Sequence, residues 1–222
     1  MMKILIFSPH PDDETLGCGG TLLKHLSDGD EIFWCLMTYG NAKMGHDEKH
    51  YCKWDNIIDR VNKEYKVKQF INLRYPSGAL DTIGYMELIS KTKRVIDTVR
   101  PDIIYVNHFS DIHTDHRYTY DIVMSSSKNF NCPFIKKIIT YETISETDFS
   151  PVSDNRAFTP NIFVDISDYM THKLKIMKLY ESEIMKEPMP RSLRSIKALA
   201  SYRGSRIGAK YGEAFQLVFE RQ

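Results

Sequence analysis

Apolar runs and stretches of helical periodicity alternate along most of the chain. Runs rich in β-branched and aromatic residues, each bounded by turn residues, predict strands at 3–7, 31–38, 69–73 and 102–107. Between and after them, apolar positions at helical spacing predict helices at 15–26, 55–65, 84–99 and 117–127. This order is typical of parallel strands joined by right-handed crossovers, so the sequence predicts an α/β fold with a mostly parallel sheet.

The later part of the chain is less regular. Apolar runs predict strands at 136–142 and 161–166, and Ser167 is a suitable cap for a helix over 168–185. The segment 143–160 is polar and interrupted by prolines, so we predict a loop that forms a lid or a pocket wall. The pattern assigns no element to the tail after Pro190.

The polar segment 39–53 raises a choice between a loop and a helix. It contains His46 and His50, whose spacing of four would suit a metal-binding pair on a helix. No apolar periodicity supports a helix there, so we favour a solvated loop on the substrate side.

The composition is that of a globular protein. With 222 residues, of which 42% are hydrophobic, the chain can bury a full core, and we predict a single domain over 1–222. The formal net charge of +1 gives no basic surface for nucleic acid, which favours a small-molecule ligand and leaves homo-oligomer formation open. No signal-peptide pattern or membrane-length apolar run is present, so we expect a cytoplasmic protein. The four cysteines lack CxxC spacing and are expected to be reduced thiols.

Polar residues gather where the first predicted strand ends. That strand runs into Ser-Pro-His-Pro-Asp-Asp-Glu at 8–14, and ligands of open α/β sheets bind at the carboxyl ends of strands. Three adjacent carboxylates repel one another unless a cation or strong hydrogen bonds hold them, which suggests a bound cation. His10 and Asp13 are three residues apart and share a face in a helical turn, whereas Asp12 points elsewhere. His10 and Asp13 therefore make half of a zinc site, beside a carboxylate available as a base.

A second polar cluster follows the fourth predicted strand, at 108–117. His113 and His116 are again three apart, and parallel strands would bring this cluster to the same edge of the sheet as the first. His10, Asp13 and His116 would then give two histidines and one aspartate with an open position, as in catalytic zinc sites. The alternative, that each cluster is an ordinary polar turn or helix cap, is disfavoured because two clusters occur at equivalent strand ends.

The glycines at 17, 19 and 20 have two interpretations. A dinucleotide-binding loop would need a further glycine where Leu22 stands, and it would place its glycines within the turn itself. We therefore favour a helix whose small residues allow close approach to the sheet.

The two clusters together resemble the PIG-L/LmbE-like family of zinc-dependent N-acetyl-sugar deacetylases. Residues 9–14 (PHPDDE) match the first motif of that family and residues 113–117 (HTDHR) its second, with Thr114 where proline is usual. The stretches 73–80 and 211–215 are similar to further family landmarks. The resemblance covers nearly the whole chain. It implies a single-domain, Rossmann-like, three-layer αβα fold with the active site at the carboxyl ends of the strands.

The resemblance also implies a reaction, the metal-dependent hydrolysis of an N-acetyl group on an amino sugar or its conjugate. By position, the zinc ligands of the family correspond to His10, Asp13 and His116. Asp12 resembles the general base. His113 is similar to the residue that stabilises the oxyanion or protonates the departing amine, and Asp115 is placed to orient it. Ferrous iron fits the same nitrogen and oxygen donors as Zn²⁺.

Two hypotheses from different classes follow. The first is a zinc amidase, and the second is a Rossmann-type nucleotide- or metal-binding module without hydrolytic activity, which would have no need for Asp12. For the amidase, substrate contacts are expected from the loops at 39–53, 76–80 and 143–160. Arg203 and Glu213 either contact hydroxyl or phosphate groups of the substrate or form an ordinary surface ion pair.

Overall fold

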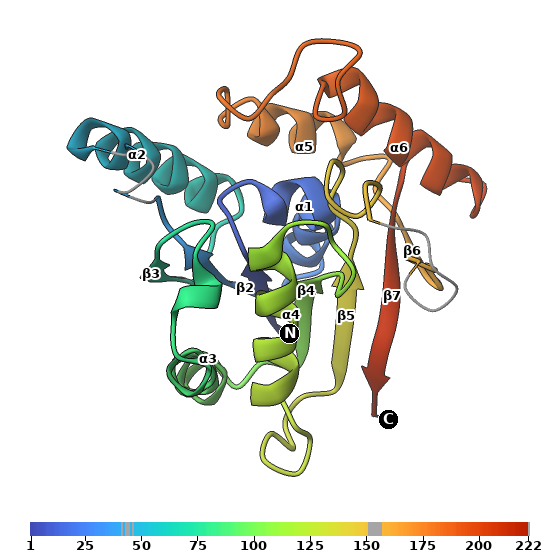
Figure 1. Cartoon of the computed structure of the whole chain (residues 1–222). Helices are drawn as coiled ribbons and strands as arrows, with labels where there is room; N and C mark the ends of the chain where they lie inside the picture. The colour runs from blue at the N-terminus through green and yellow to red at the C-terminus, as the bar shows by residue number, and fades with distance from the viewer. Residues whose placement is uncertain (41, 43–44, 46, 151–156, 222) are drawn as a thin grey trace.

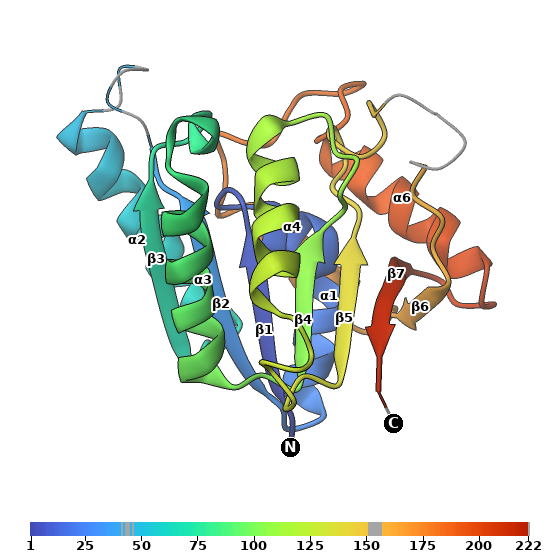
Figure 2. The ribbon, with the colours of Figure 1, turned by 60° about the horizontal axis from the view of Figure 1, so that its bottom comes forward.

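A seven-stranded sheet forms the centre of the protein, in the order β3-β2-β1-β4-β5-β7-β6 (Figure 1). The computed structural model describes all residues except 41, 43–44, 46, 151–156 and 222. Its strands are β1 (Lys3–Ser8), β2 (Glu31–Thr38), β3 (Gln69–Tyr75), β4 (Ile103–Asn107), β5 (Lys137–Tyr141), β6 (Ile162–Asp165) and β7 (Gly212–Glu220). Strands β1 to β5 pair in parallel, and β7 runs antiparallel between β5 and β6 (Figure 2). The expected α/β fold with a mostly parallel sheet is confirmed.

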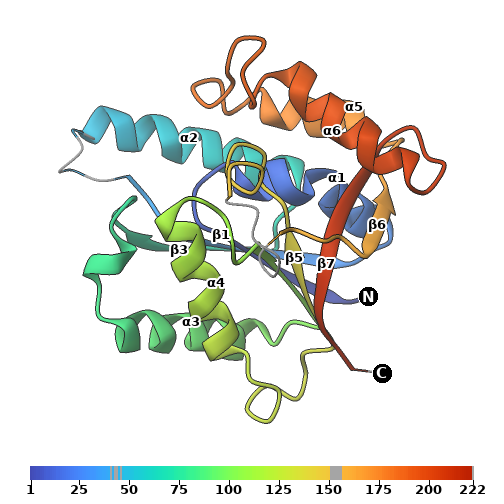
Figure 3. The ribbon, with the colours of Figure 1, turned by 45° about the vertical axis from the view of Figure 1, so that its right-hand side comes forward.

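Helices cover both faces of the sheet and complete a three-layer fold (Figure 3). They are α1 (Asp13–Ser27), α2 (Glu48–Glu64), α3 (Tyr85–Val99), α4 (Thr114–Ser126), α5 (Met170–Met177) and α6 (Leu193–Ser205). Successive strand residues point to opposite faces, so Ile4 and Ile6 pack toward α1, α2, α5 and α6, whereas Leu5 and Phe7 pack toward α3 and α4. Among the described residues, no helix is long and apolar enough to cross a membrane.

The strand order reverses between β1 and β4, and this reversal places the site. From β1 the chain moves outward to β2 and β3, then returns to add β4 on the other side of β1. The carboxyl ends of β1 and β4 are therefore neighbours, and the chain leaves them toward opposite sides of the sheet. A crevice forms between the two loops at such a point. The two polar clusters of the sequence are these two loops, so the fold brings them together as expected.

The elements differ from the sequence prediction in three places. Helix α2 begins at Glu48, so the end of the predicted loop at 39–53 is helical and includes His50; His46 lies outside the described residues. The helix expected over 168–185 ends at Met177. The tail contains α6 and β7, which the pattern left unassigned. Strand β7 was missed because its position depends on pairing with β5 and β6, which are distant in sequence.

The glycines of α1 permit close packing rather than phosphate binding. A Cβ atom at Gly17 would lie 2.1 Å from the Tyr141 ring, and one at Gly20 would lie 2.8 Å from Ile166. Both neighbours belong to packed core residues, so any side chain at these positions would force the helix away from the sheet. The interpretation of these glycines as close-approach positions is confirmed.

Glu213 and Arg203 do not form the surface ion pair considered from the sequence. The Glu213 carboxylate is buried and accepts hydrogen bonds from the backbone N–H groups of Gly20 and Thr21, at 2.8 and 2.7 Å. Arg203 instead donates two hydrogen bonds to the Glu142 carboxylate, at 2.7 and 2.6 Å. Neither residue lines the pocket at the strand ends. Both line a separate small cavity of about 20 Å³.

Candidate active site

Three side chains from the two loops converge on one point. The Nδ1 atom of His10 lies 3.3 Å from Nε2 of His116, and Oδ2 of Asp13 lies 3.5 and 3.3 Å from these two nitrogens. A tetrahedral centre with ligand bonds of about 2.0–2.1 Å has ligand atoms about 3.3–3.4 Å apart, so the three atoms have the spacing that such a metal requires. Asp13 begins α1, and its carboxylate is held by the backbone N–H of His10 at 2.8 Å.

The remaining nitrogen of each histidine faces a carboxylate. Nε2 of His10 lies 3.0 Å from Oδ2 of Asp115, and Nδ1 of His116 lies 2.9 Å from Oδ2 of Asp111. A carboxylate only accepts hydrogen bonds, so each outer nitrogen donates to its carboxylate. A neutral histidine in this arrangement has its lone pair on the inner nitrogen, which is the form that binds a metal. Carboxylates in this position fix the tautomer and orientation of metal-binding histidines. The donor set therefore fits a divalent metal.

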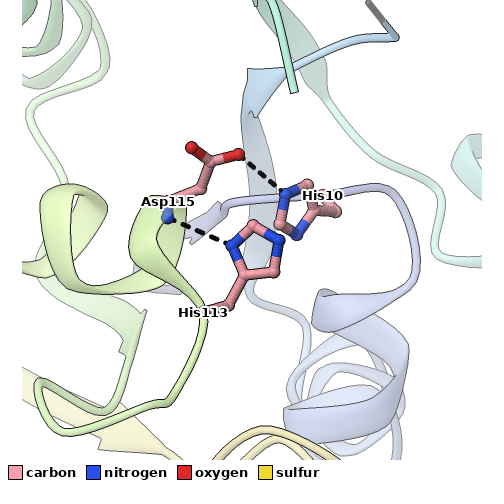
Figure 4. Close-up of side chains that lie close together, drawn as sticks. All are labelled: His10, His113 and Asp115. Atoms are coloured by element: carbon pink, nitrogen blue, oxygen red, sulfur yellow. Dashed lines mark hydrogen bonds and ion pairs between the residues drawn. The ribbon is translucent and has the colours of Figure 1, made fainter. Parts of the chain in front are cut away.

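Asp115 contacts His10 more directly than it contacts His113 (Figure 4). Its carboxylate accepts the His10 bond and the backbone N–H groups of Gly78 and Leu80, at 2.6 and 3.2 Å. Burial acts to raise the pKa of Asp115, but these bonds, led by that from His10, lower it below the usual value. The family resemblance suggested that Asp115 orients His113. The bond that joins the two residues runs from the backbone N–H of Asp115 to Nδ1 of His113, at 3.1 Å.

That backbone bond determines which nitrogen of His113 carries the proton. His113 is the N-cap of α4, and its Nδ1 must be unprotonated because it accepts from an N–H group. Burial, followed by repulsion from His10 and His116, lowers the pKa of His113 to about 4. The ring is therefore neutral near pH 7, with its proton on Nε2.

Asp12 lies beside the three converging residues but is not one of them. It is buried and has a φ angle of 123°, which is strained for a residue other than glycine. Its Oδ2 lies 3.5 Å from Nη1 of Arg191, which also contacts Glu183 at 3.4 Å. Burial, then repulsion from Asp13 and Glu183, raises the pKa of Asp12 well above its usual range despite the contact with Arg191.

A pocket of about 350 Å³ opens over these groups, which is within the size range of small-molecule sites. Its lining includes residues of all three segments that the sequence assigned to substrate contacts: Tyr39 and Gly40, Ser77 and Gly78, and Thr143, Ser145 and Glu146. These described residues lie at the pocket, as expected. Their contact with a substrate stays a prediction.

Several residues of the site were missed by sequence reasoning. Asp111 lies within the second polar cluster, five residues before His116, and that proximity was the signal that could have identified it. Arg191, Glu183 and Trp54 line the pocket from segments that carry no local motif. Arg191 is 179 residues from Asp12, so only the fold brings the two together.

The protein therefore has an α/β fold, and where its strand order reverses two histidines and one carboxylate have the spacing of a metal site. The family model described as GlcNAc-PI de-N-acetylase, PIG-L, matches residues 5–127, more than half of the chain. The chain belongs to this family, as its two motifs indicated. The matched region contains His10, Asp12, Asp13, His113 and His116.

Comparisons with individual proteins agree with this assignment. The chain is 26% identical over 225 aligned positions to the diacetylchitobiose deacetylase of Thermococcus kodakarensis, covering 97% of this chain and 83% of that protein. It is 28% identical over 194 positions to the uncharacterized deacetylase YaiS of Escherichia coli, covering 81% of this chain and 90% of that protein. The crystal structure of the conserved protein TT1542 from Thermus thermophilus superposes with a TM-score of 0.80 at 22% identity, over 100% of this chain and 97% of that one. This structure shows a shared fold.

Proposed function

We propose that this protein is a metal-dependent hydrolase that removes the N-acetyl group from an acetylated amino sugar. The observation that carries the proposal is the mutual spacing of 3.3–3.5 Å among the inner atoms of His10, Asp13 and His116, next to a separate buried carboxylate, Asp12. A binding module would need the ligands but not the adjacent base. Family membership and the deacetylase names of the relatives support the same reaction class.

His10 Nδ1, Asp13 Oδ2 and His116 Nε2 would hold the metal. A divalent ion there would lower the pKa of water and polarise the acetyl carbonyl, which are the two requirements for hydrolysing an amide at neutral pH. Zn²⁺ suits two nitrogens and one carboxylate oxygen, and Fe²⁺ fits the same donors.

Asp12 and His113 would divide the proton chemistry between them. The Asp12 carboxylate takes a proton from the attacking water and returns it to the amine nitrogen as the carbon–nitrogen bond breaks, so that acetate and the free amine are the products. Its raised pKa suits a group that must both accept and release a proton. His113, neutral and protonated at Nε2, donates a hydrogen bond to the carbonyl oxygen as negative charge develops there. This assignment favours oxyanion stabilisation over proton donation by His113.

The outer pocket would bind the sugar. Trp54 and Tyr39 line it and offer aromatic surfaces, while Glu146, Glu183 and Arg191 offer polar groups for hydroxyls. A pocket of about 350 Å³ accommodates a small saccharide. Because one relative is a diacetylchitobiose deacetylase, we infer that short N-acetylglucosamine saccharides are the first substrates to try.

Metal content and acetate release test the proposal together. We expect the purified protein to hold about one metal ion per chain and to release acetate from N-acetylglucosamine or N,N'-diacetylchitobiose. Chelation should abolish release, and Zn²⁺ or Fe²⁺ should restore it. His116→Ala should lose both metal and activity. The control is His172→Ala, because His172 bonds Glu64 outside the site. Acetate release that survives complete metal removal would contradict the proposal.

A further inference from the structure

A buried carboxylate, that of Glu14, contacts the backbone of the proposed base. Glu14 is 1% exposed, and its Oε2 accepts the backbone N–H of Asp12 at 3.1 Å. The same turn gives Asp12 its strained φ of 123°, a conformation that persists only where the surroundings enforce it. Glu14 is therefore in a position to hold the backbone of Asp12.

The other oxygen of Glu14 is anchored by two hydroxyl groups. Its Oε1 accepts from Thr15 Oγ1 at 2.6 Å and from the Tyr180 hydroxyl at 2.7 Å. Thr15 gives its only proton to Glu14, so the Tyr65 hydroxyl, 3.0 Å from Thr15 Oγ1, must donate to Thr15. Tyr180 thus contacts Glu14 directly, whereas Tyr65 acts one hydrogen bond further away.

Tyr180 reaches this network from a distant part of the chain. It follows α5, is 166 residues from Glu14, and is fully buried with its ring 6.1 Å from that of Trp54. Within the part of the chain that the structure describes, no ion pair holds Glu14, so its orientation depends on its hydrogen bonds. Removing the Tyr180 hydroxyl would leave Oε1 of Glu14 with the bond from Thr15 alone and would loosen the hold of Glu14 on the backbone of Asp12.

We propose that Tyr180 is a positioning residue for the reaction. Through Glu14 it holds the backbone of Asp12 in the conformation that presents the Asp12 carboxylate to the pocket. This inference rests on the proposed role of Asp12 as the general base. The proposal gives a role in catalysis to a residue after α5, outside both sequence motifs.

Two matched substitutions separate positioning from simple packing. Tyr180→Phe removes the hydroxyl that contacts Glu14 and keeps the ring beside Trp54, and Tyr65→Phe removes a hydroxyl of the same network that does not contact Glu14. Acetate release is measured for both with the metal-loaded full chain, well below the melting temperature of each variant. Metal content and KM are measured alongside kcat.

We expect Tyr180→Phe to lower kcat by about tenfold with KM and metal content unchanged, because small misplacements of a catalytic group are costly. Tyr65→Phe should stay within about twofold of wild type, although both variants lose thermal stability. Equal kcat values for the two variants would overturn the positioning role and leave the proposed function standing. Full activity of Asp12→Asn would instead overturn the proposed function, and the inference with it.

Discussion

Helix α1 has two starting points, and the buried charges around them are balanced differently. The helix is interrupted at Cys18, where φ is −141° and ψ is 20°, so a second helical segment begins near Gly20. The first start carries Asp12, Asp13 and Glu14 as adjacent buried carboxylates. The second start receives the carboxylate of Glu213, which accepts from two backbone N–H groups there. Both arrangements place negative charge at a helix N-terminus, where it is favourable.

The difference lies in the balance of charge around each start. At the second start, Lys173 lies 2.7 Å from Glu213 and also donates to the carbonyl of Leu16, so charges and hydrogen bonds are matched. At the first start, the described residues supply one permanent cation, Arg191, for three carboxylates. The imbalance shows in the pKa of Asp12, which is raised well above its usual range, chiefly by burial. Perturbed pKa values cluster at functional sites, so the unmatched charge at the first start supports the proposed active site. The matched charges at the second start indicate a structural role.

Asp12→Asn should show the largest effect and should separate the two starts most clearly. We expect acetate release to fall by about 10²–10⁴-fold, since the substitution removes a proton acceptor. Metal content should be retained, because Asp12 is not one of the three converging ligands. The free energy of unfolding of the metal-free protein should be equal or higher, because the folded state disfavours the charged form of Asp12.

Urea unfolding and a kinetic assay on the same preparation measure both quantities. A variant that lost stability along with activity would show that Asp12 has a structural role like that of Glu213. The comparison between the two starts would then fail.

Lys173→Met should have the reverse signature. The Lys173 and Glu213 side chains are each 4% exposed, and removing one partner leaves an uncompensated buried charge. Breaking a buried ion pair of this kind costs about 3–5 kcal/mol of unfolding free energy. The variant that remains folded should keep its kcat, because neither residue lines the active-site pocket.

The double replacement Lys173→Met with Glu213→Gln provides the control. It removes both charges, so it should recover part of the lost stability. The losses of unfolding free energy in Lys173→Met and in Glu213→Gln are measured separately and added. A double variant that loses more than this sum would contradict the interpretation of the pair as matched charges.

The same contrast explains which of the two sites could be predicted from the sequence. The first start was predictable because His10, Asp12 and Asp13 lie in one turn after an apolar strand, and His116 follows a second such strand. Local spacing and the rule for strand ends were sufficient to bring them together. The second start was not predictable, because Lys173 and Glu213 lie 157 and 193 residues from their backbone partners Leu16 and Gly20.

Distance in sequence also limited the description of the site itself. Arg191 and Tyr180 reach the first start only because α5 and the segment after it pack beside α1. Each has an ordinary sequence environment, so nothing local marks it. Asp111 is different, since it stood within the second cluster and could have been assigned from its proximity to His116. Strand β7 shows the same limit for the fold, as its antiparallel place between β5 and β6 is set by long-range pairing.

Glu64→Gln should have the smallest effect, and it tests whether burial rather than the number of charged contacts sets the cost. Glu64 also joins two elements, accepting from His172 at 2.7 Å and Lys175 at 2.8 Å, but Lys175 is 65% exposed. Exposed pairs contribute about 0.2–1 kcal/mol, so the unfolding free energy should fall by no more than this at pH 7.

The pH dependence of that difference identifies its source. The hydrogen bond from Lys175, followed by that from His172, lowers the pKa of Glu64 below its ordinary value of 4.5. A carboxylate with a lowered pKa stabilises the fold above its unfolded pKa and loses this contribution as the pH falls through the folded value. Urea unfolding should therefore give a small difference between wild type and Glu64→Gln at pH 7 that shrinks below about pH 4.5. A loss as large as that of Lys173→Met would mean that exposure does not weaken these contacts, and the contrast drawn between matched and unmatched buried charge would lose its physical basis.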